Sequence, residues 1–253
     1  MKKLLILLLM TFLFYSCSSD SSSDSNPVAT DSILIRRTIQ TTSGSSQNAI
    51  INDFAYTGNK LNTITNSEGL VQKYFYTGDV ITRMEWYVDN SGIPIIYDYT
   101  YTNGKLATMK KTDNLVDQEF RIVYTYNNDG TITTNNYSRT DNSGEEFDGQ
   151  SKYFMTTTNE IQRIEDYNTA GTQIASTSTF VYDAKNNPFK NILGWGKLLI
   201  PGAGFYANVT SSVTNFGTQS ATFQYNADNF PTTEVRSYSG NPGTTINLTF
   251  IYE

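Results

Sequence analysis

The stretch Tyr99-Thr-Tyr101-Thr-Asn-Gly104-Lys-Leu106 decides the fold of this 253-residue chain, because near-copies of it recur along most of the sequence. Each copy has two aromatic residues separated by a spacer, and most copies continue into a turn and an apolar residue. The pairs are Phe54-Ala-Tyr56, Tyr74-Phe-Tyr76, Tyr99-Thr-Tyr101, Tyr124-Thr-Tyr126, Phe180-Val-Tyr182, Phe223-Gln-Tyr225 and Phe250-Ile-Tyr252, with a degenerate copy at Tyr153-Phe-Met155. A repeat of this kind predicts one supersecondary unit per copy.

Further turns fall about midway between the aromatic pairs, so each repeat contains two turns and two strands. These turns are Ser67-Glu-Gly69, Asn90-Ser-Gly92, Asn142-Ser-Gly144 and Thr169-Ala-Gly171. Two strands per repeat, joined by short turns, are consecutive hairpins. We therefore predict an all-β fold: an antiparallel up-and-down meander of consecutive hairpins that forms an extended curved sheet or a partly closed barrel, with one apolar capping insertion.

The strand that enters each aromatic pair alternates between apolar and polar residues, which predicts one buried and one wet face. In Gln118–Tyr126 the apolar face carries Phe120, Ile122, Tyr124 and Tyr126. The outgoing strands alternate less regularly, since Leu61 and Ile64 are three residues apart and a regular strand would place them on opposite faces. Either a β-bulge or a leucine tucked under the turn would place both in the core.

The repeat is interrupted once, by an apolar, glycine-punctuated insertion at about residues 186–209. Such a segment is costly to leave in water, so one interpretation is a cap that packs over the aromatic face. In this cap we expect Trp195 near the rim and three side chains pointing inward: Leu198, Leu199 and Ile200. The other interpretation is that Trp195, Phe205 and Tyr206 line a ligand-binding site.

The N-terminus predicts export and lipidation. Lys2 and Lys3 precede a short apolar run that ends at Ser16-Cys17, a pattern that resembles the lipobox of Gram-negative lipoproteins. We therefore expect a signal peptide over residues 1–16, an acylated Cys17, a flexible Ser/Asp-rich tether over 17–32 and the repeat domain over 33–253. The resemblance implies a lipid anchor at the outer membrane, on its periplasmic face or at the cell surface. An ordinary secretory signal with an incidental cysteine is the alternative.

Three further resemblances are of lower specificity. The repeats from Phe54 to Tyr252 are similar to the tyrosine–aspartate repeats of Rhs-type proteins, although only Tyr182-Asp183 keeps the aspartate. Asn187-Pro-Phe-Lys190 and the stretch from Phe223 to Pro231 resemble uncharacterised envelope lipoproteins with a porin-like β fold, a resemblance that implies no activity. Asp31-Ser32-Ile33 resembles an O-glycosylation motif, which would place a glycan on Ser32.

Composition excludes several function classes. The net charge of −6, with no Lys/Arg cluster, makes nucleic acid a poor partner. The chain has no histidine, and an acylated Cys17 offers no thiol, so the commonest general base and a thiol nucleophile are missing. We therefore expect no catalytic residue, no cofactor and no metal. Two chemistries remain open: an acidic pair for glycoside hydrolysis, drawn from Glu85, Glu165 and Asp166, and Ca²⁺ binding in the turn 141–148.

The sequence thus favours a lipid-anchored, non-catalytic binding module, for a glycan or a peptide. Stacked aromatic side chains on an extended sheet suit sugar rings and flat partners. A structural partner in an outer-membrane complex and an acidic-pair glycoside hydrolase are the alternatives. A transmembrane β-barrel shares the alternating aromatic strands, but several predicted strands are shorter than a span of the bilayer requires.

Overall fold

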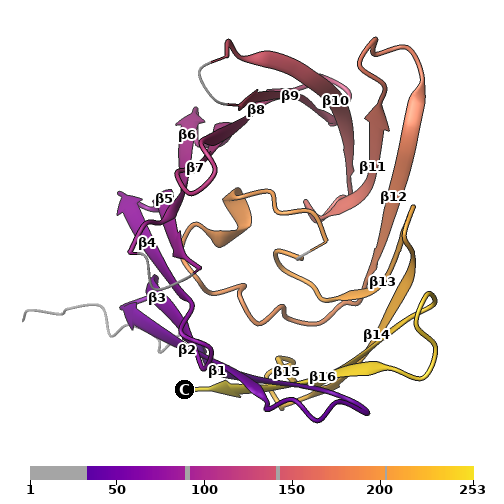
Figure 1. Ribbon diagram of the computed structural model, residues 1–253. Helices are drawn as coiled ribbons and strands as arrows, with labels where there is room; N and C mark the ends of the chain where they lie inside the picture. Colours follow the sequence, from indigo (N-terminus) through magenta and orange to yellow (C-terminus); the bar gives the residue numbers. More distant parts are fainter. Residues whose placement is uncertain (1–32, 89–91, 141–142, 203) are drawn as a thin grey trace, which may run out of the picture. The chain divides into compact units, whose positions relative to one another are not determined.

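The computed structural model describes residues 33–88, 92–140, 143–202 and 204–253. Sixteen antiparallel strands follow one another around a closed barrel, in which β16 pairs with β1 (Figure 1). The strands are β1 (Ile35–Thr42), β2 (Ile50–Thr57), β3 (Lys60–Asn66), β4 (Val71–Thr77), β5 (Val80–Tyr87), β6 (Ile95–Thr102), β7 (Lys105–Asp113), β8 (Gln118–Tyr126), β9 (Ile132–Thr140), β10 (Glu146–Met155), β11 (Ile161–Tyr167), β12 (Ile174–Tyr182), β13 (Val209–Thr214), β14 (Gly217–Tyr225), β15 (Pro231–Tyr238) and β16 (Thr245–Tyr252). The predicted meander is confirmed, and it closes fully.

The predictions for the N-terminus concern residues that lie outside those described. These are the signal peptide 1–16, the acylated Cys17, the tether 17–32 and the glycosylated Ser32. In the part of the chain that the structure describes, no helix is long and apolar enough to cross a membrane.

A β-bulge at the start of most outgoing strands explains the irregular apolar spacing. In the β6–β7 hairpin, Thr100 pairs with Thr108 but Tyr101 pairs with Leu106, so Ala107 is an extra residue on β7. The same shift occurs at Tyr56, Tyr76, Met155, Tyr182 and Tyr225. The extra residue turns Leu106 and Met109 to the same face, so the bulge, rather than a leucine tucked under the turn, is correct.

The second aromatic residue of each pair ties its hairpin to the preceding repeat. The Tyr101 hydroxyl donates a hydrogen bond of 2.8 Å to the Ile81 carbonyl, at the bulge of the neighbouring hairpin. Equivalent bonds run from Tyr56 to Ile35, from Tyr182 to Ile161 and from Tyr252 to Pro231. In two other copies the hydroxyl has a different partner: the Tyr76 hydroxyl accepts the Leu61 N–H, and the Tyr225 hydroxyl donates to Asp183. A hydroxyl at the second position is thus used in each of these copies, whereas the first position accepts Phe.

We expect Tyr101→Phe to lower the free energy of unfolding by about 1 kcal/mol, because the buried Ile81 carbonyl loses its hydroxyl donor. Tyr99→Phe is the matched control in the same repeat, since the Tyr99 hydroxyl hydrogen-bonds no residue that the structure describes. It should change stability by much less. Urea unfolding of the two variants measures the difference, and equal losses would contradict this role for the second tyrosine.

The barrel interior is divided into two apolar clusters. One contains Leu61 and Ile81 and the other Leu106 and Ile161, and all four side chains are at most 1% exposed. Each cluster is completed by residues of the insertion between β12 and β13: Trp195 and Leu198 in the first, Leu199 and Phe205 in the second. The insertion is therefore part of the core of both halves of the barrel.

The outer face of the barrel is polar, as the predicted wet face requires. Neighbouring strands exchange ion pairs across it: Arg37 with Asp53 at 2.6 Å, Arg83 with Asp98 at 2.8 Å, and Lys110 with Glu119 at 2.7 Å. Strands β12–β16 carry mainly Ser and Thr at their outward positions, such as Thr177, Ser220 and Thr222.

Candidate functional site

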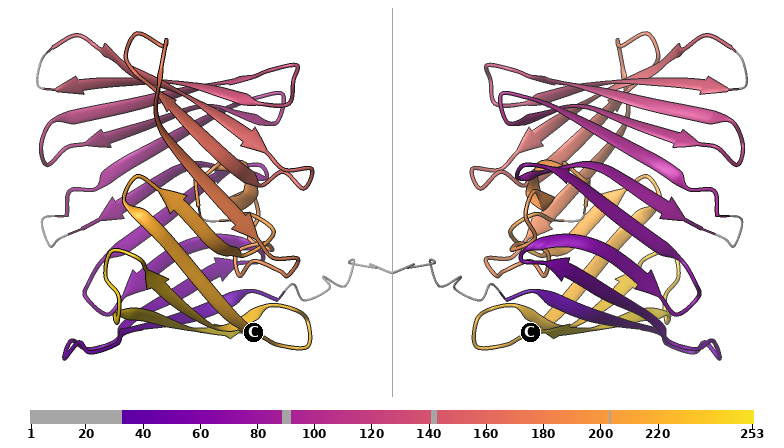
Figure 2. Two further views of the ribbon diagram at one scale, coloured as in Figure 1. Left: turned by 90° about the vertical axis from the view of Figure 1, so that its right-hand side faces the viewer. Right: turned by 90° about the vertical axis from the view of Figure 1, so that its left-hand side faces the viewer.

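The segment 183–208, which we call the plug, lies inside the barrel (Figures 1 and 2). It contains one short 3-10 helix, η1 (Trp195–Lys197). The predicted capping insertion is thus confirmed, with boundaries close to the expected 186–209. It does not lie over an open sheet but fills one part of a closed lumen, because the barrel wall surrounds it on every side.

Hydrogen bonds tie the plug to the surrounding rim of the barrel. Three of them are spread along the plug: Asn186 N–H to the Asn229 carbonyl at 3.0 Å, Asn191 Nδ2 to the Ile33 carbonyl at 2.9 Å, and Leu193 N–H to the Asn59 carbonyl at 2.9 Å. Gly194, at φ 77°, approaches β5 so closely that a Cβ would lie 3.0 Å from the Asp79 carbonyl oxygen. Only glycine fits this contact without a shift of the backbone.

Glu160, in the turn before β11, is the strongest anchor of the plug. Its side chain is 1% exposed, and its carboxylate accepts hydrogen bonds from three successive plug N–H groups: Phe205 at 2.9 Å, Tyr206 at 2.7 Å and Ala207 at 2.8 Å. Successive backbone N–H groups that point to one place form a concavity that binds anions. Here a side chain of the barrel fills that concavity.

Asp183 fixes the two ends of the plug to each other. Its carboxylate accepts the backbone N–H of Asn208 at 3.0 Å and also the hydroxyl of Tyr225. Burial, together with this bond to Asp183, raises the pKa of Tyr225, so its hydroxyl stays protonated and can donate. The one copy that keeps the Tyr-Asp sequence is therefore the copy from which the plug begins.

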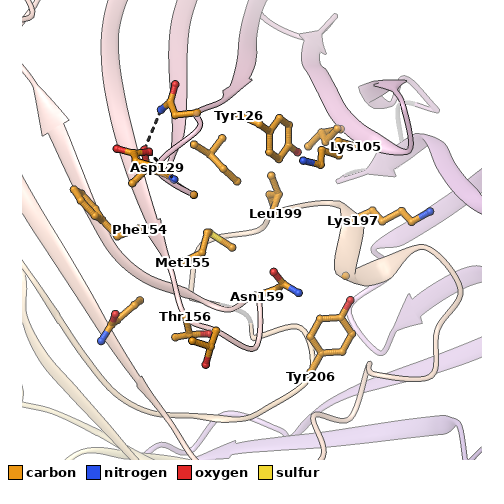
Figure 3. A pocket seen from close by; sticks show the side chains of 18 of the residues that line it. Lys105, Tyr126, Asp129, Phe154, Met155, Thr156, Asn159, Lys197, Leu199 and Tyr206 are labelled. Atoms are coloured by element: carbon orange, nitrogen blue, oxygen red, sulfur yellow. Dashed lines mark hydrogen bonds between the residues drawn. The ribbon is translucent and has the colours of Figure 1, made fainter.

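A cavity of about 790 Å³ opens between the plug and the turns of β6–β11, and we call it the mouth cavity (Figure 3). Two aromatic side chains line it, Tyr126 of β8 and Tyr206 of the plug. Phe154 of β10 lies at its outer edge, where the guanidinium of Arg163 is 3.8 Å from the centre of its ring. Amide side chains of Asn159 and Gln162 lie among them. A volume in this range accommodates a small molecule or a segment of a polymer.

The charges of the mouth cavity are only partly paired. Lys152 Nζ is 3.2 Å from Asp129 Oδ2, whereas the lining residues Lys105 and Lys197 form no ion pair with a described residue. Lys105 Nζ instead lies 4.7 Å from the centre of the Tyr126 ring. Hydrogen bonds from the Thr131 hydroxyl and N–H lower the pKa of Asp129 to about 2, so Asp129 stays ionised near neutrality. The cavity therefore offers aromatic faces, amides and two lysines that are unpaired within the described residues.

The three candidate binding residues predicted from the sequence differ in their exposure to solvent. Tyr206 is 43% exposed and lines the mouth cavity, whereas Phe205 is 2% exposed and lies in the core. Trp195 is also buried, 4.8 Å from the Phe189 ring and 6.3 Å from Tyr74, so its expected position near the rim is wrong. Leu198 and Leu199 point inward as expected, but Ile200 is 37% exposed.

The acidic residues considered for hydrolysis do not converge. Glu85 accepts the hydroxyl of Tyr87, and Glu165 pairs with Arg163, on the outer face of the barrel. Asp166 is not on a solvated face as expected but points inward, where Ser151 and Ser176 donate to it. No group of three or more acidic residues within the described ranges could hold a metal ion, and the turn 141–148 lies partly outside those ranges.

Fold and plug together define the class: a closed sixteen-stranded antiparallel barrel with an internal plug. A porin-like protein from Bacteroides vulgatus ATCC 8482 is similar, with a TM-score of 0.52 at 13% identity over 88% of this chain and 99% of that chain. A porin-like protein from Bacteroides uniformis ATCC 8492 matches at a TM-score of 0.36 and 14% identity, over 85% of this chain and 86% of that chain. No family model matches the chain, and no curated protein does.

The first likeness concerns the fold alone, and it agrees with the porin-like β fold that the stretches around Asn187 and Phe223 resembled. Glu160 was missed from the sequence. Glu160 lies in the turn that follows the degenerate repeat Tyr153-Phe-Met155, just before Ile161. The sequence around it gives no signal for its partners, because these are backbone N–H groups of the plug, 45 to 47 residues further along the chain.

Proposed function

We propose that this protein is a lipid-anchored protein of the cell envelope that binds a glycan in its mouth cavity and performs no catalysis. The observation that carries the proposal is the lining of this cavity, which is bordered by the exposed Tyr206 and by Tyr126 (Figure 3). Flat aromatic faces stack on the C–H faces of sugar rings. The fold, shared with a porin-like protein from Bacteroides, supports a place in the envelope.

The polar groups of the cavity favour a glycan over a cationic ligand. The side-chain amides of Asn159 and Gln162 hydrogen-bond no residue among those described, so they can still donate and accept. An amide matches a hydroxyl group, which also does both. Asp129 is paired with Lys152, and the lining residues Lys105 and Lys197, which form no ion pair with a described residue, repel cations and suit hydroxyl or acidic groups of a glycan. A peptide, which also presents donors and acceptors, is the competing ligand.

Tyr206→Ala tests the proposed site. We expect the variant to bind glycans about ten-fold to a hundred-fold more weakly, since loss of one aromatic stacking platform costs about 1–3 kcal/mol. A glycan array identifies the best binder, and calorimetric titration then measures its affinity for the wild type and the variant. A peptide array of equal size, run in parallel, tests the competing ligand class. Thr125→Ala, on the outer face of β8 and outside the cavity lining, is the control and should bind as the wild type does. Binding of peptides alone, or of no glycan, would reject the proposal.

The lipid anchor has a separate test. Cys17→Ser should release the protein from membranes, because the diacylglyceryl group needs the thiol and the amine-linked chain is added afterwards. Two or more acyl chains anchor stably, whereas one chain binds only marginally. Fractionation with labelled palmitate measures both properties. If the wild type takes up no label and the variant stays in the membrane, lipidation is rejected. The proposal of a glycan site does not depend on this result.

A second candidate function is assembly in an outer-membrane complex, and one observation favours it. The outward positions of β12–β16 carry no charged side chain among the described residues, and Val181 and Val213 are exposed there. Phe216, in the turn between β13 and β14, is 98% exposed. An uncharged face with exposed apolar side chains is typical of an interaction surface. Retention of the protein in a large complex after mild detergent extraction would support this function.

A further inference from the structure

A second cavity, of about 420 Å³, lies elsewhere in the barrel, against the residues around Phe189 and Asn208 of the plug, and we call it the lumen cavity. It shares no lining residue with the mouth cavity. Folded cores are packed to a density that leaves few voids larger than a water molecule. The lumen cavity is open to solvent on one side, so a ligand can enter it, and its lining decides what it could bind.

The wall of the lumen cavity contains an ion pair between two neighbouring inward positions of β15, Glu234 and Arg236. Glu234 is 4% exposed, and its carboxylate accepts two hydrogen bonds from the guanidinium of Arg236, one of them 2.9 Å long. Burial opposes the charge of Arg236, but the bonds and the charge of Glu234 outweigh it and raise its pKa. The Arg236 side chain is 34% exposed, so the guanidinium reaches from the buried Glu234 carboxylate into the cavity.

Two side-chain amides in the same cavity have unused hydrogen-bonding capacity. Gln219, on the inward face of β14, hydrogen-bonds no described residue through its side chain. Gln72 accepts the Tyr74 hydroxyl through Oε1 at 2.7 Å, which leaves its NH₂ group without a partner among the described residues. The aromatic rings of Phe54, Phe223 and Phe250 complete the wall.

We propose that the lumen cavity is a second binding site, for a small uncharged saccharide. The carboxylate of Glu234 and the guanidinium of Arg236 neutralise each other, so the cavity has no net charge that would favour an ionic ligand over a neutral one. The amides and the outer edges of the ion pair match hydroxyl groups, and the phenylalanine rings match the C–H face of a sugar ring. The volume lies within the range of small-molecule sites. This inference is independent of the mouth cavity and of its proposed ligand.

The test uses the full chain in detergent and four disaccharides as probes: maltose, cellobiose, lactose and N,N′-diacetylchitobiose. Saturation-transfer NMR should show binding of at least one, and calorimetric titration then gives its affinity. Gln219→Ala should weaken that affinity at least ten-fold with an unchanged melting temperature, because Gln219 holds no described residue in place. Ser220→Ala, the next residue and on the outer face, is the matched control and should bind normally.

Further variants and competitors test which of the two cavities binds the disaccharide and whether the ligand is uncharged. Tyr206→Ala should leave disaccharide binding unchanged, since Tyr206 lines only the mouth cavity. If Tyr206→Ala abolishes it and Gln219→Ala does not, the saccharide binds in the mouth and the lumen site is rejected. Octanoate and spermidine should not compete. Competition by either one, or no binding of any of the four disaccharides, would overturn the proposal.

Discussion

Glu160→Ala is expected to lower the free energy of unfolding by about 3–5 kcal/mol, the cost of removing one partner from a buried charged network. The reason is geometric. The N–H groups of Phe205, Tyr206 and Ala207 all point to this one carboxylate, and in its absence they would be buried without an acceptor. Because these bonds connect a barrel turn to the plug, their loss should also loosen the plug.

Two measurements check this expectation. Urea unfolding gives the stability, and the emission of Trp195, which lies in the plug, should shift to the red in the native state. Glu119→Ala is the matched control, since Glu119 pairs with Lys110 and Arg139 on the outer face and should cost under about 1 kcal/mol. Equal losses in the two variants would show that the plug does not depend on Glu160.

The part of the fold predictable from sequence is the part determined by neighbours along the chain. The recurring pair, as at Tyr99 and Tyr101, specified strands, turns and the inward face, because side-chain alternation depends only on backbone geometry. The irregular spacing of Leu61 and Ile64 was compatible with a bulge, but it did not distinguish a bulge from a leucine tucked under the turn. The reason for an invariant second tyrosine was hidden, since its partner, such as Ile81 for Tyr101, belongs to the preceding repeat.

Closure of the barrel and the position of the plug depend on contacts that sequence patterns do not encode. The pairing of β1 with β16 joins the two ends of the domain, and no local signal distinguishes a closed barrel from a curved sheet. The plug was recognisable by its apolar composition. The positions of Trp195 and Ile200 within it were mispredicted, because the irregular backbone around η1 has no period from which burial can be read.

Phe205→Ala should cost about 3–5 kcal/mol of stability, through lost transfer free energy and the cavity left behind. Phe205 is the largest of the fully buried side chains and packs in the cluster that contains Leu106 and Ile161. The adjacent Tyr206 is 43% exposed and projects into the mouth cavity. Its truncation should therefore cost about 1 kcal/mol or less.

These two neighbours make a strict comparison, because the backbone N–H groups of both donate to Glu160 and neither substitution alters those bonds. Phe205→Ala should unfold at a much lower urea concentration, yet bind glycan normally while it is folded. Tyr206→Ala should show the reverse: wild-type unfolding and weakened binding. If both variants lost stability equally, Tyr206 would belong to the core, and the mouth cavity would lose the one plug-borne aromatic face on which its assignment as a binding site depends.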